Sequence, residues 1–272
     1  MNIYQEIVRA LKPAALGAEV RRIVSGGIYT AVEVVSNKGG RALGLAYVEG
    51  DRCTGGEIGG CEGDRCRRGG GRSPLMDGGA KFPVSASDLL SSLIMISDGG
   101  EGKGRGVESS VATALASALA QLTLTEWETG DVLEQVSVKR GEGVTVVGGF
   151  PFTPRLAEMG AELAVFDRRL EDFDEGEMGA ALNGADVVII TGAALANGTL
   201  PGILERIGGA REAIILGPTT PLVPEAFADT PVTRLMGVIP LDIDGVVEVI
   251  VSGGGTRGFS RYVQKVGVRV GK

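Results

Sequence analysis

The sequence predicts an α/β protein with an N-terminal α+β part and a C-terminal doubly wound parallel sheet. Its 272 residues exceed the roughly 100–200 residues of one compact domain, which favours two parts. Three strand-like runs separated by turn residues follow an N-terminal helical pattern. Beyond residue 131, continuously apolar runs alternate with helix-like runs, which is typical of parallel strands covered on both faces.

The N-terminal part, assigned to residues 1–128, begins with a helix. Ile3, Ile7 and Leu11 share one face of that helix. Glycine-containing turns then separate three runs that alternate like strands. We expect a three-stranded antiparallel meander at residues 18–24, 27–35 and 41–48.

Two glycine-rich stretches interrupt the rest of this part. Residues 49–79 carry almost no apolar side chain, so the Gly/Cys/Arg-rich segment at 50–79 is expected to be a long exposed loop. A helix at 86–96, capped by Ser85 or Ser87, follows. The stretch 98–106 then leads to an alanine-rich helix at 107–122.

The C-terminal part, assigned to residues 129–272, opens with a short helix at 131–138 and a strand at 143–149. Alternation of strands and helices implies right-handed βα units, hence the doubly wound sheet. Further strands are expected at 161–167, 186–192, 212–217 and 232–239, and helices at 175–183, 199–207, 222–228 and 244–251.

Composition excludes several function classes. The chain has no histidine, which excludes a Ser-His-Asp hydrolase, a His-ligated zinc site and an imidazole base. A net charge of −7 disfavours a broad nucleic-acid footprint. The sequence contains no run of 18 apolar residues, so no membrane span is expected. Charges at Glu6, Arg9 and Lys12 argue against a signal peptide. Three cysteines are typical of a cytoplasmic chain without a disulfide framework.

Candidate ligand contacts follow the strands of the C-terminal part, because open α/β sheets bind ligands beyond the carboxyl ends of their strands. Glycine, proline and small polar residues stand at each of these ends. The same residue types also serve tight turns and helix caps, so each has a structural explanation beside the functional one. The candidates are Gly149, Phe150, Pro151, Asp167, Thr191, Gly192, Asn197, Thr199, Gly217, Pro218, Thr219, Thr220 and Asp242.

The N-terminal part adds candidates that could close over these strand ends, namely Tyr29, Thr30, Glu108 and Ser110. With no histidine, metal binding or acid–base work falls to carboxylates, hydroxyls or thiols. The candidate metal ligands are Glu108, Asp167 and Asp242. Less favoured are Cys53, Cys61 and Cys66, which lack the paired Cys-x-x-Cys spacing of zinc ribbons. Arginines interspersed among these cysteines resemble an RNA-binding patch, but nearby carboxylates weaken that interpretation.

A nucleotide-type cofactor is the alternative. Asp167 stands about where a dinucleotide-binding fold has its ribose carboxylate. The segment 148–154 nevertheless lacks a third glycine and carries two prolines where backbone donors would be needed. An enzyme using NAD or S-adenosylmethionine at the strand ends therefore stays open.

Three C-terminal motifs carry a family resemblance: Phe150-Pro151 after Val-Val-Gly-Gly, the segment 191–200, and the segment 217–222. Through them the chain resembles the heavy-metal chelation family of domains of unknown function. Residues 28–32 and 108–115 are similar to its companion domain. Ala112 and Ser117 stand where the family has Gly and Asn. Thr219 replaces the family's Ser and keeps the hydroxyl.

The resemblance implies an N-terminal domain like that of enolases, a Rossmann-like C-terminal domain and a site in the cleft between them. We therefore expect a cytoplasmic protein that binds a small polar or anionic ligand, or a metal, in this cleft. A heavy or divalent metal ion is the candidate cofactor. We expect a small-molecule or metal partner, with no nucleic acid and no membrane; a homo-oligomer is left open. Whether a reaction is catalysed does not follow from the sequence.

Overall fold

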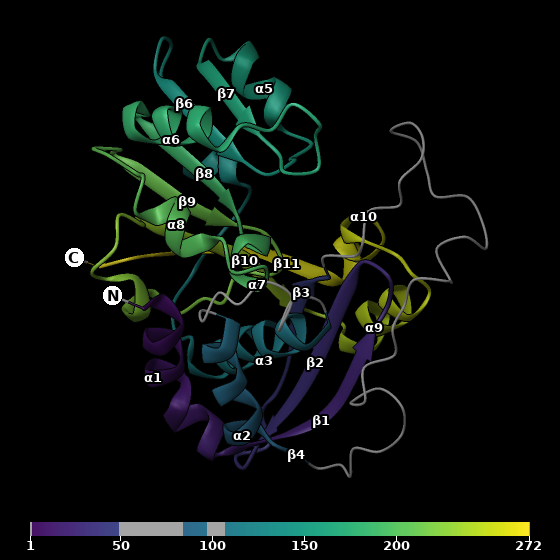
Figure 1. Cartoon of the computed structure of the whole chain (residues 1–272). Coiled ribbons are helices and arrows are strands. Elements are labelled where there is room, and N and C mark those ends of the chain that lie inside the picture. The colour runs from purple at the N-terminus through teal and green to yellow at the C-terminus, as the bar shows by residue number, and fades with distance from the viewer. Residues whose placement is uncertain (1, 49–83, 97–106, 272) are drawn as a thin grey trace.

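The computed structural model describes residues 2–48, 84–96 and 107–271. It holds two sheets, one of four strands in the order β3-β2-β1-β4 and one of seven in the order β5-β11-β10-β9-β8-β6-β7. Figure 1 shows the N-terminal sheet below the larger sheet. None of the helices in the described ranges is long and apolar enough to cross a membrane. The predicted loop at 50–79, the three cysteines within it and the stretch 98–106 lie outside the described residues.

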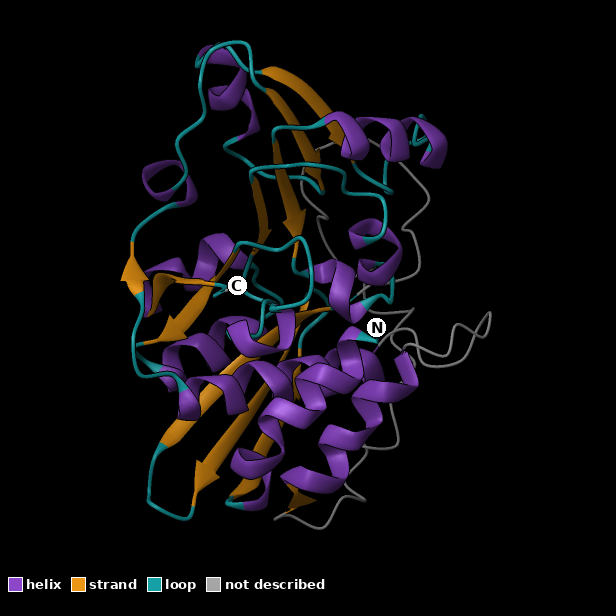
Figure 2. Ribbon diagram, turned by 90° about the vertical axis from the view of Figure 1, so that its left-hand side faces the viewer, coloured by secondary structure: helices purple, strands orange, loops and turns teal. Residues whose placement is uncertain are grey.

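The predicted meander of the N-terminal part is confirmed. Its strands are β1 (Ala18–Ser25), β2 (Tyr29–Ser36) and β3 (Arg41–Tyr47), paired antiparallel in chain order. The short β4 (Val84–Ser85) extends the sheet beside β1. The helices are α1 (Ile3–Leu16), capped by Asn2, then α2 (Ala86–Ser91), η2 (Ser92–Ile96) and α3 (Val107–Thr123). Figure 2 shows these helices covering one face of the sheet.

The seven-stranded sheet confirms the predicted α/β class. Five of its strands run parallel: β6 (Gly143–Val147), β7 (Glu162–Phe166), β8 (Val187–Thr191), β9 (Glu212–Leu216) and β10 (Arg234–Pro240). Two further strands, β5 (Glu128–Thr129) and β11 (Val263–Arg269), are antiparallel additions that the sequence did not predict. β11 mixes polar and apolar residues, so the continuously apolar run that marks the parallel strands is missing.

Helices connect these strands on both faces of the sheet. Val188 and Ile190 of β8 enter the core cluster that contains residues of α6 and α8, whereas Val187 and Ile189 enter the cluster with α4 and α5. This alternation is the doubly wound packing that the sequence predicts. The connections are α4 (Val132–Gln135), α5 (Thr153–Glu158), α6 (Glu175–Gly184), α7 (Ala193–Ala196), α8 (Leu200–Leu204), η3 (Pro224–Phe227), α9 (Ile243–Val251), α10 (Thr256–Phe259) and η4 (Ser260–Tyr262).

The strand order determines where a ligand site can form. Numbered from β6 along the chain, the five parallel strands have the spatial order 2-1-3-4-5. The connections therefore reverse direction between β6 and β8. In open α/β sheets, the crevice for ligands lies beyond the carboxyl ends of the strands at such a reversal. Here that position faces the N-terminal sheet (Figure 1).

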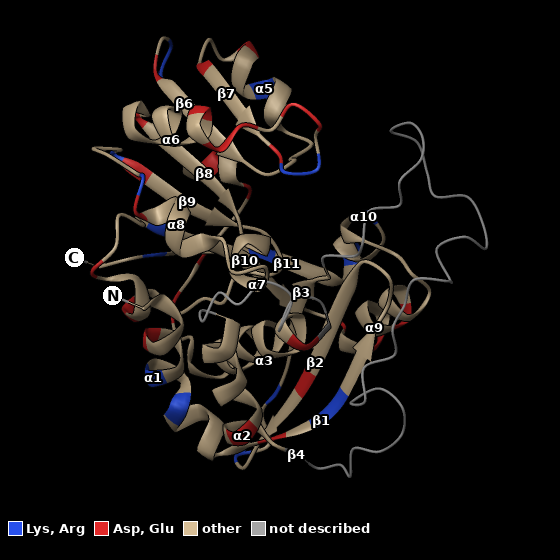
Figure 3. Ribbon diagram, viewed as in Figure 1, with Lys and Arg blue, Asp and Glu red and all other residues tan. Residues whose placement is uncertain are grey.

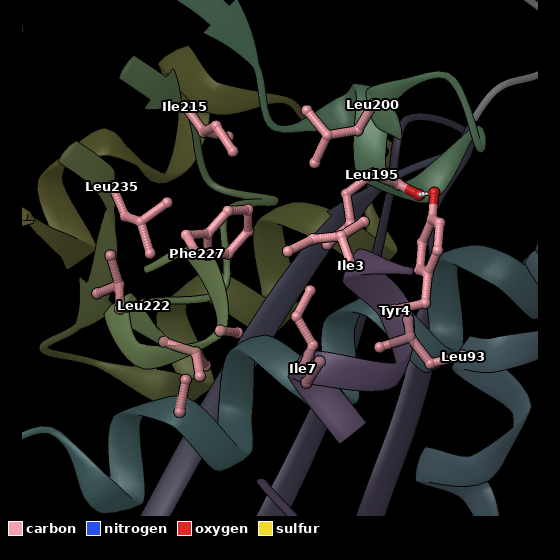
Figure 4. Close-up of a cluster of buried hydrophobic side chains, with 14 of the residues drawn as sticks. Ile3, Tyr4, Ile7, Leu93, Leu195, Leu200, Ile215, Leu222, Phe227 and Leu235 are labelled. Carbon is pink, nitrogen blue, oxygen red and sulfur yellow. Dashed lines mark hydrogen bonds between the residues drawn. The ribbon is translucent and has the colours of Figure 1, made fainter. Parts of the chain in front are cut away.

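The two parts share one hydrophobic core. Ile3 and Ile7 of α1 belong to the same buried cluster as Leu222 and Phe227 of the C-terminal part (Figure 4). The Tyr4 hydroxyl donates to the Leu195 carbonyl at 2.9 Å. Burial raises the pKa of Tyr4, so this phenol stays protonated as a donor. The domain boundary at 128/129 stays a prediction, and the core is continuous across it.

The other face of the N-terminal sheet is covered by the end of the chain. Ala31 and Leu43 form a cluster with Val246 and Ile250 of α9. At the turn between β1 and β2, a Cβ on Gly26 would lie 1.8 Å from the Ile250 carbonyl oxygen. A Cβ on Gly27 would meet nothing within 4 Å. The two glycines thus differ: Gly26 permits close packing of α9, which turn propensity alone does not reveal.

This contrast gives a matched pair of variants. Gly26→Ala should lower the free energy of unfolding by about 1–3 kcal/mol, because the methyl group has no space beside α9. Gly27→Ala should change it by less than about 0.5 kcal/mol. Urea denaturation of both variants measures the difference. Equal effects would show that α9 does not pack against this turn.

Candidate functional site

The loop after β6 reaches the strand-order reversal with two glycines. Gly148 has φ of +114°, and a Cβ there would lie 2.8 Å from Cβ of Thr191, at the end of β8. Gly149 is exposed. A Cβ on Gly149 would lie 2.4 Å from an Arg169 guanidinium nitrogen and 2.7 Å from an Asp167 carboxylate oxygen. The glycine pair therefore lets an arginine–aspartate pair lie on the backbone after β6.

Asp167 and Arg169 form this pair directly after β7. The side-chain Nε of Arg169 donates to Oδ1 of Asp167 at 2.9 Å, and the backbone N–H of Arg169 donates to the same oxygen at 3.0 Å. Burial raises the pKa of Asp167, but these hydrogen bonds and the guanidinium charge outweigh it and lower the pKa overall. Asp167 raises the pKa of Arg169, and the Tyr47 phenol raises it further. Figure 3 shows acidic and basic residues next to one another in the loop between β7 and α6.

Tyr47 brings the N-terminal part to the same place. Its ring packs edge-on against Tyr29, with centroids 6.0 Å apart, and Tyr29 packs in the same way on Phe259 at 5.3 Å. The Tyr47 N–H donates to Oγ1 of Thr219 at 2.9 Å, across the junction of the two parts. We call Tyr47, Gly149, Asp167 and Arg169 the junction cluster.

The two threonines after β9 have different surroundings. Thr219 is buried; besides its bond to Tyr47, its carbonyl accepts a hydrogen bond from the Ser117 hydroxyl at 3.4 Å. Ser117 thus makes a polar contact across the junction without the amide expected from the family resemblance. The buried Oγ1 of Thr220 has no hydrogen-bond partner among the described residues. It packs against Gly192, whose Cβ would lie 2.6 Å from it.

Other predicted contacts are bonded within their own part. The buried Ser110 hydroxyl donates to Oγ1 of Thr30 at 2.9 Å, and Thr30 donates to Ser25 at 3.1 Å. Oδ1 of Asn197 accepts from the Thr199 hydroxyl at 2.7 Å. The hydroxyls of Ser110 and Thr30 therefore stabilise the N-terminal part, and the Asn197 amide stabilises the loop before α8.

The remaining predicted residues line the strand ends with ordinary packing. Phe150 stacks on Phe152 at 5.2 Å, and Pro151 between them is exposed. Oγ1 of Thr191 accepts from the Ala193 N–H at 3.3 Å. Gly217 has φ of +130°, a conformation that favours glycine, and Pro218 beside it is partly buried.

The carboxylates predicted as metal ligands lie on separate elements. Glu108 is exposed in the first turn of α3, and Asp242 caps α9 by accepting from the Gly245 N–H at 3.0 Å. Asp167 is paired with Arg169. Throughout residues 2–48, 84–96 and 107–271, no group of three or more Cys, Asp and Glu side chains could hold a metal ion. The described residues thus do not fit a metal held by the protein alone.

The structure brings Gly149 and Asp167 together and joins Thr219 to the N-terminal sheet. Sequence reasoning missed Tyr47 and Arg169. Both had a signal: Tyr47 is the register partner of the predicted Tyr29, and Arg169 follows Asp167 by two residues in the same loop. A separate open hollow of about 380 Å³ lies between α6 and the two residues that follow α8, lined by Glu175, Gly176, Gly179, Asn183, Glu205 and Arg206.

Comparison with known proteins identifies the family. Residues 131–269 match the family described as "DUF364: Putative heavy-metal chelation". The chain belongs to this family. The resemblance inferred from the strand-end motifs is thereby confirmed. No curated protein matches the chain.

Two solved structures share the fold of this DUF364 chain. A DUF364 protein with unknown function from Pyrococcus horikoshii has a TM-score of 0.75 and 22% identity, covering 98% of this chain and 100% of its own. A second DUF364 protein, from Desulfitobacterium hafniense, has a TM-score of 0.72 and 20% identity, and the match covers 98% of this chain and 97% of that protein. These likenesses support the fold; the enolase-like description of the N-terminal part stays a prediction.

Variants of the adjacent Thr219 and Thr220 test the hydrogen bond that joins the two parts. Thr219→Val should lower the free energy of unfolding by about 1–3 kcal/mol, because it leaves the Tyr47 N–H without its acceptor. Thr220→Val should be neutral or slightly stabilising, because its hydroxyl has no hydrogen-bond partner among the described residues to lose. Thermal and urea unfolding compare the two, with Thr219→Ser as the variant that keeps the acceptor. A larger loss for Thr220→Val than for Thr219→Val would contradict the assignment.

Proposed function

We propose that this DUF364 protein binds a small molecule carrying oxyanion groups, carboxylate or phosphate, at the junction cluster. The observation that carries the proposal is the Arg169 guanidinium held over Gly149, at the carboxyl end of β6 beside the strand-order reversal. Arginine is suited to oxyanions because its planar fork donates several hydrogen bonds at once.

The exposure of the cluster supports this role. The side chain of Arg169 is 67% exposed, whereas that of Asp167 is 12% exposed. Asp167 therefore holds the arginine from the protein side while other guanidinium N–H groups face solvent. Tyr47 is partly exposed and supplies a phenol from the N-terminal part. A ligand bound here would contact both parts.

The heavy-metal description of the family needs a different source of ligands. The described carboxylates are dispersed, so a metal would fit this part of the chain only when already held by a small acidic chelator. Cys53, Cys61 and Cys66 lie outside the described residues and stay a prediction. The small number of cysteines likewise supports the proposed cytoplasmic location.

The proposal predicts a binding defect confined to one arginine. Citrate and inorganic phosphate should each raise the melting temperature of the full chain, because a ligand of the native state stabilises it. Arg169→Gln should weaken the binding of the preferred anion at least about tenfold in isothermal titration. Arg206→Gln is the matched control, since Arg206 pairs with Glu175 at 2.9 Å on another face. Equal binding by both variants would refute the site.

A second set of ligands separates the alternatives. Binding of Zn²⁺ or Ni²⁺ alone should not depend on Arg169, whereas binding of their citrate complexes should depend on it. The Cys53→Ser/Cys61→Ser/Cys66→Ser variant removes thiol binding from this measurement. A shift with NAD or S-adenosylmethionine that exceeds the shift with either anion would favour the cofactor-using enzyme instead.

A further inference from the structure

The loop after β6 has a different neighbour on each side. In the sheet, β6 lies between β7 and β8 (Figure 1). On the β7 side, a Cβ on Gly149 would lie 2.4 Å from a guanidinium nitrogen of Arg169. On the β8 side, a Cβ on Gly148 would lie 2.8 Å from Cβ of Thr191 and 3.6 Å from the Phe150 ring. A cation and an aromatic ring thus lie on opposite sides of two consecutive glycines.

The charge of Arg169 is already matched by one carboxylate. Nε of Arg169 donates to the two oxygens of Asp167 at 2.9 and 3.1 Å, and Nη2 donates to Oδ2 at 2.5 Å. Asp167 therefore occupies one edge of the guanidinium, and N–H groups of the other edge can donate to a ligand. Among the described residues, Arg169 is the only cation in an ion pair with Asp167. A bound anion consequently meets a neutral pair of charges.

The loop between β7 and α6 is acidic. Residues 167–174 contain four carboxylates and two guanidiniums, which gives this stretch a net charge of −2 (Figure 3). Glu171, Asp172 and Asp174 are exposed. At pH 7 a phosphate group carries a charge of about −1.5 to −2, whereas a carboxylate carries a single charge. The loop therefore repels a phosphate more strongly than it repels a monocarboxylate.

The backbone after β6 offers few donors for a phosphate group. Phosphate sites at strand ends of α/β folds depend on a run of backbone N–H groups. Pro151 has no N–H, so it ends such a run two residues after Gly149. Beyond it, the Thr153 N–H donates to the Phe150 carbonyl at 3.2 Å, and the Arg155 N–H is likewise bonded within the loop. The backbone here compensates little of the charge of a phosphate.

The Phe150 ring offers a contact for the uncharged part of a ligand. It stacks on Phe152 with ring centroids 5.2 Å apart, and both residues are partly exposed. Consecutive Cα atoms are about 3.8 Å apart, so a molecule as small as one ring with a carboxylate extends from Arg169 across Gly149 to Phe150. Burial of an apolar body against an aromatic ring is favourable. The surroundings of the loop therefore suit an acid with an apolar body.

We infer that the ligand of the junction cluster is a monocarboxylate with an apolar body. Its carboxylate pairs with Arg169, and its body lies on Phe150. The Tyr47 phenol, which lies beside Arg169, adds a hydrogen-bonding group without adding charge. This inference rests on the proposed function and names the oxyanion that the cluster selects. Phosphates and polycarboxylates bind more weakly, because their additional charge finds no additional cation among the described residues.

Isothermal titration of the full chain at pH 7 with benzoate and with inorganic phosphate tests the inference. Benzoate should bind at least about tenfold more tightly than phosphate. Phe150→Ala should weaken benzoate binding at least about fivefold and leave phosphate binding unchanged, because phosphate has no apolar body. Phe150→Leu is the matched control, since it keeps an apolar side chain and should retain most of the benzoate affinity. Unchanged benzoate binding by Phe150→Ala would overturn the inference.

A variant of Asp167 tests the selection by charge. Asp167→Asn keeps an oxygen that accepts from Arg169 but removes the negative charge. It should raise the affinity for phosphate relative to benzoate at least about fivefold. Tighter binding of phosphate than of benzoate by the wild type, with both anions dependent on Arg169, would overturn this inference and leave the proposed function standing. Binding of both anions without any dependence on Arg169 would refute the proposed function, and this inference with it.

Discussion

The burial of α3 on every side is the constraint on which the arrangement of both parts depends. Residues 109–120 of this helix are all buried, and most are alanine or serine. A Cβ on Gly44 of β3 would lie 1.8 Å from the Ala114 carbonyl oxygen and 2.4 Å from the Ala118 nitrogen. The backbones of helix and strand therefore touch, which only small side chains permit.

This close approach determines the geometry of the junction. With α3 against β3, the Ser117 hydroxyl reaches the carbonyl of Thr219, while the end of β3 offers its N–H to the hydroxyl of the same threonine. One loop residue after β9 is thus bound by a helix and a strand of the other part. The rings of Tyr29 and Tyr47 are held in place by Phe259, so the phenol beside Arg169 belongs to a packed group.

Much of the fold could be predicted from periodicity. The apolar face of α1, the meander and the parallel strands all carry patterns of the expected period. The short helices α5, α7 and α10 were missed because four to six residues show no periodicity. β11 was missed because its alternation resembles an exposed segment. At the site, Asp167 was found from strand position, but Arg169 depends on a contact with Gly149 that sequence spacing does not show.

The position of β11 also bears on how the chain can fold during synthesis. The last strand lies between β10 and β5, so β5 finds its neighbour only when residues 263–269 are available. The outer face of the N-terminal sheet likewise waits for α9. Because these contacts join residues far apart in sequence, they are costly to form early. One apolar face of the N-terminal sheet therefore stays uncovered until α9 is available, and residues 243–269 complete both sheets.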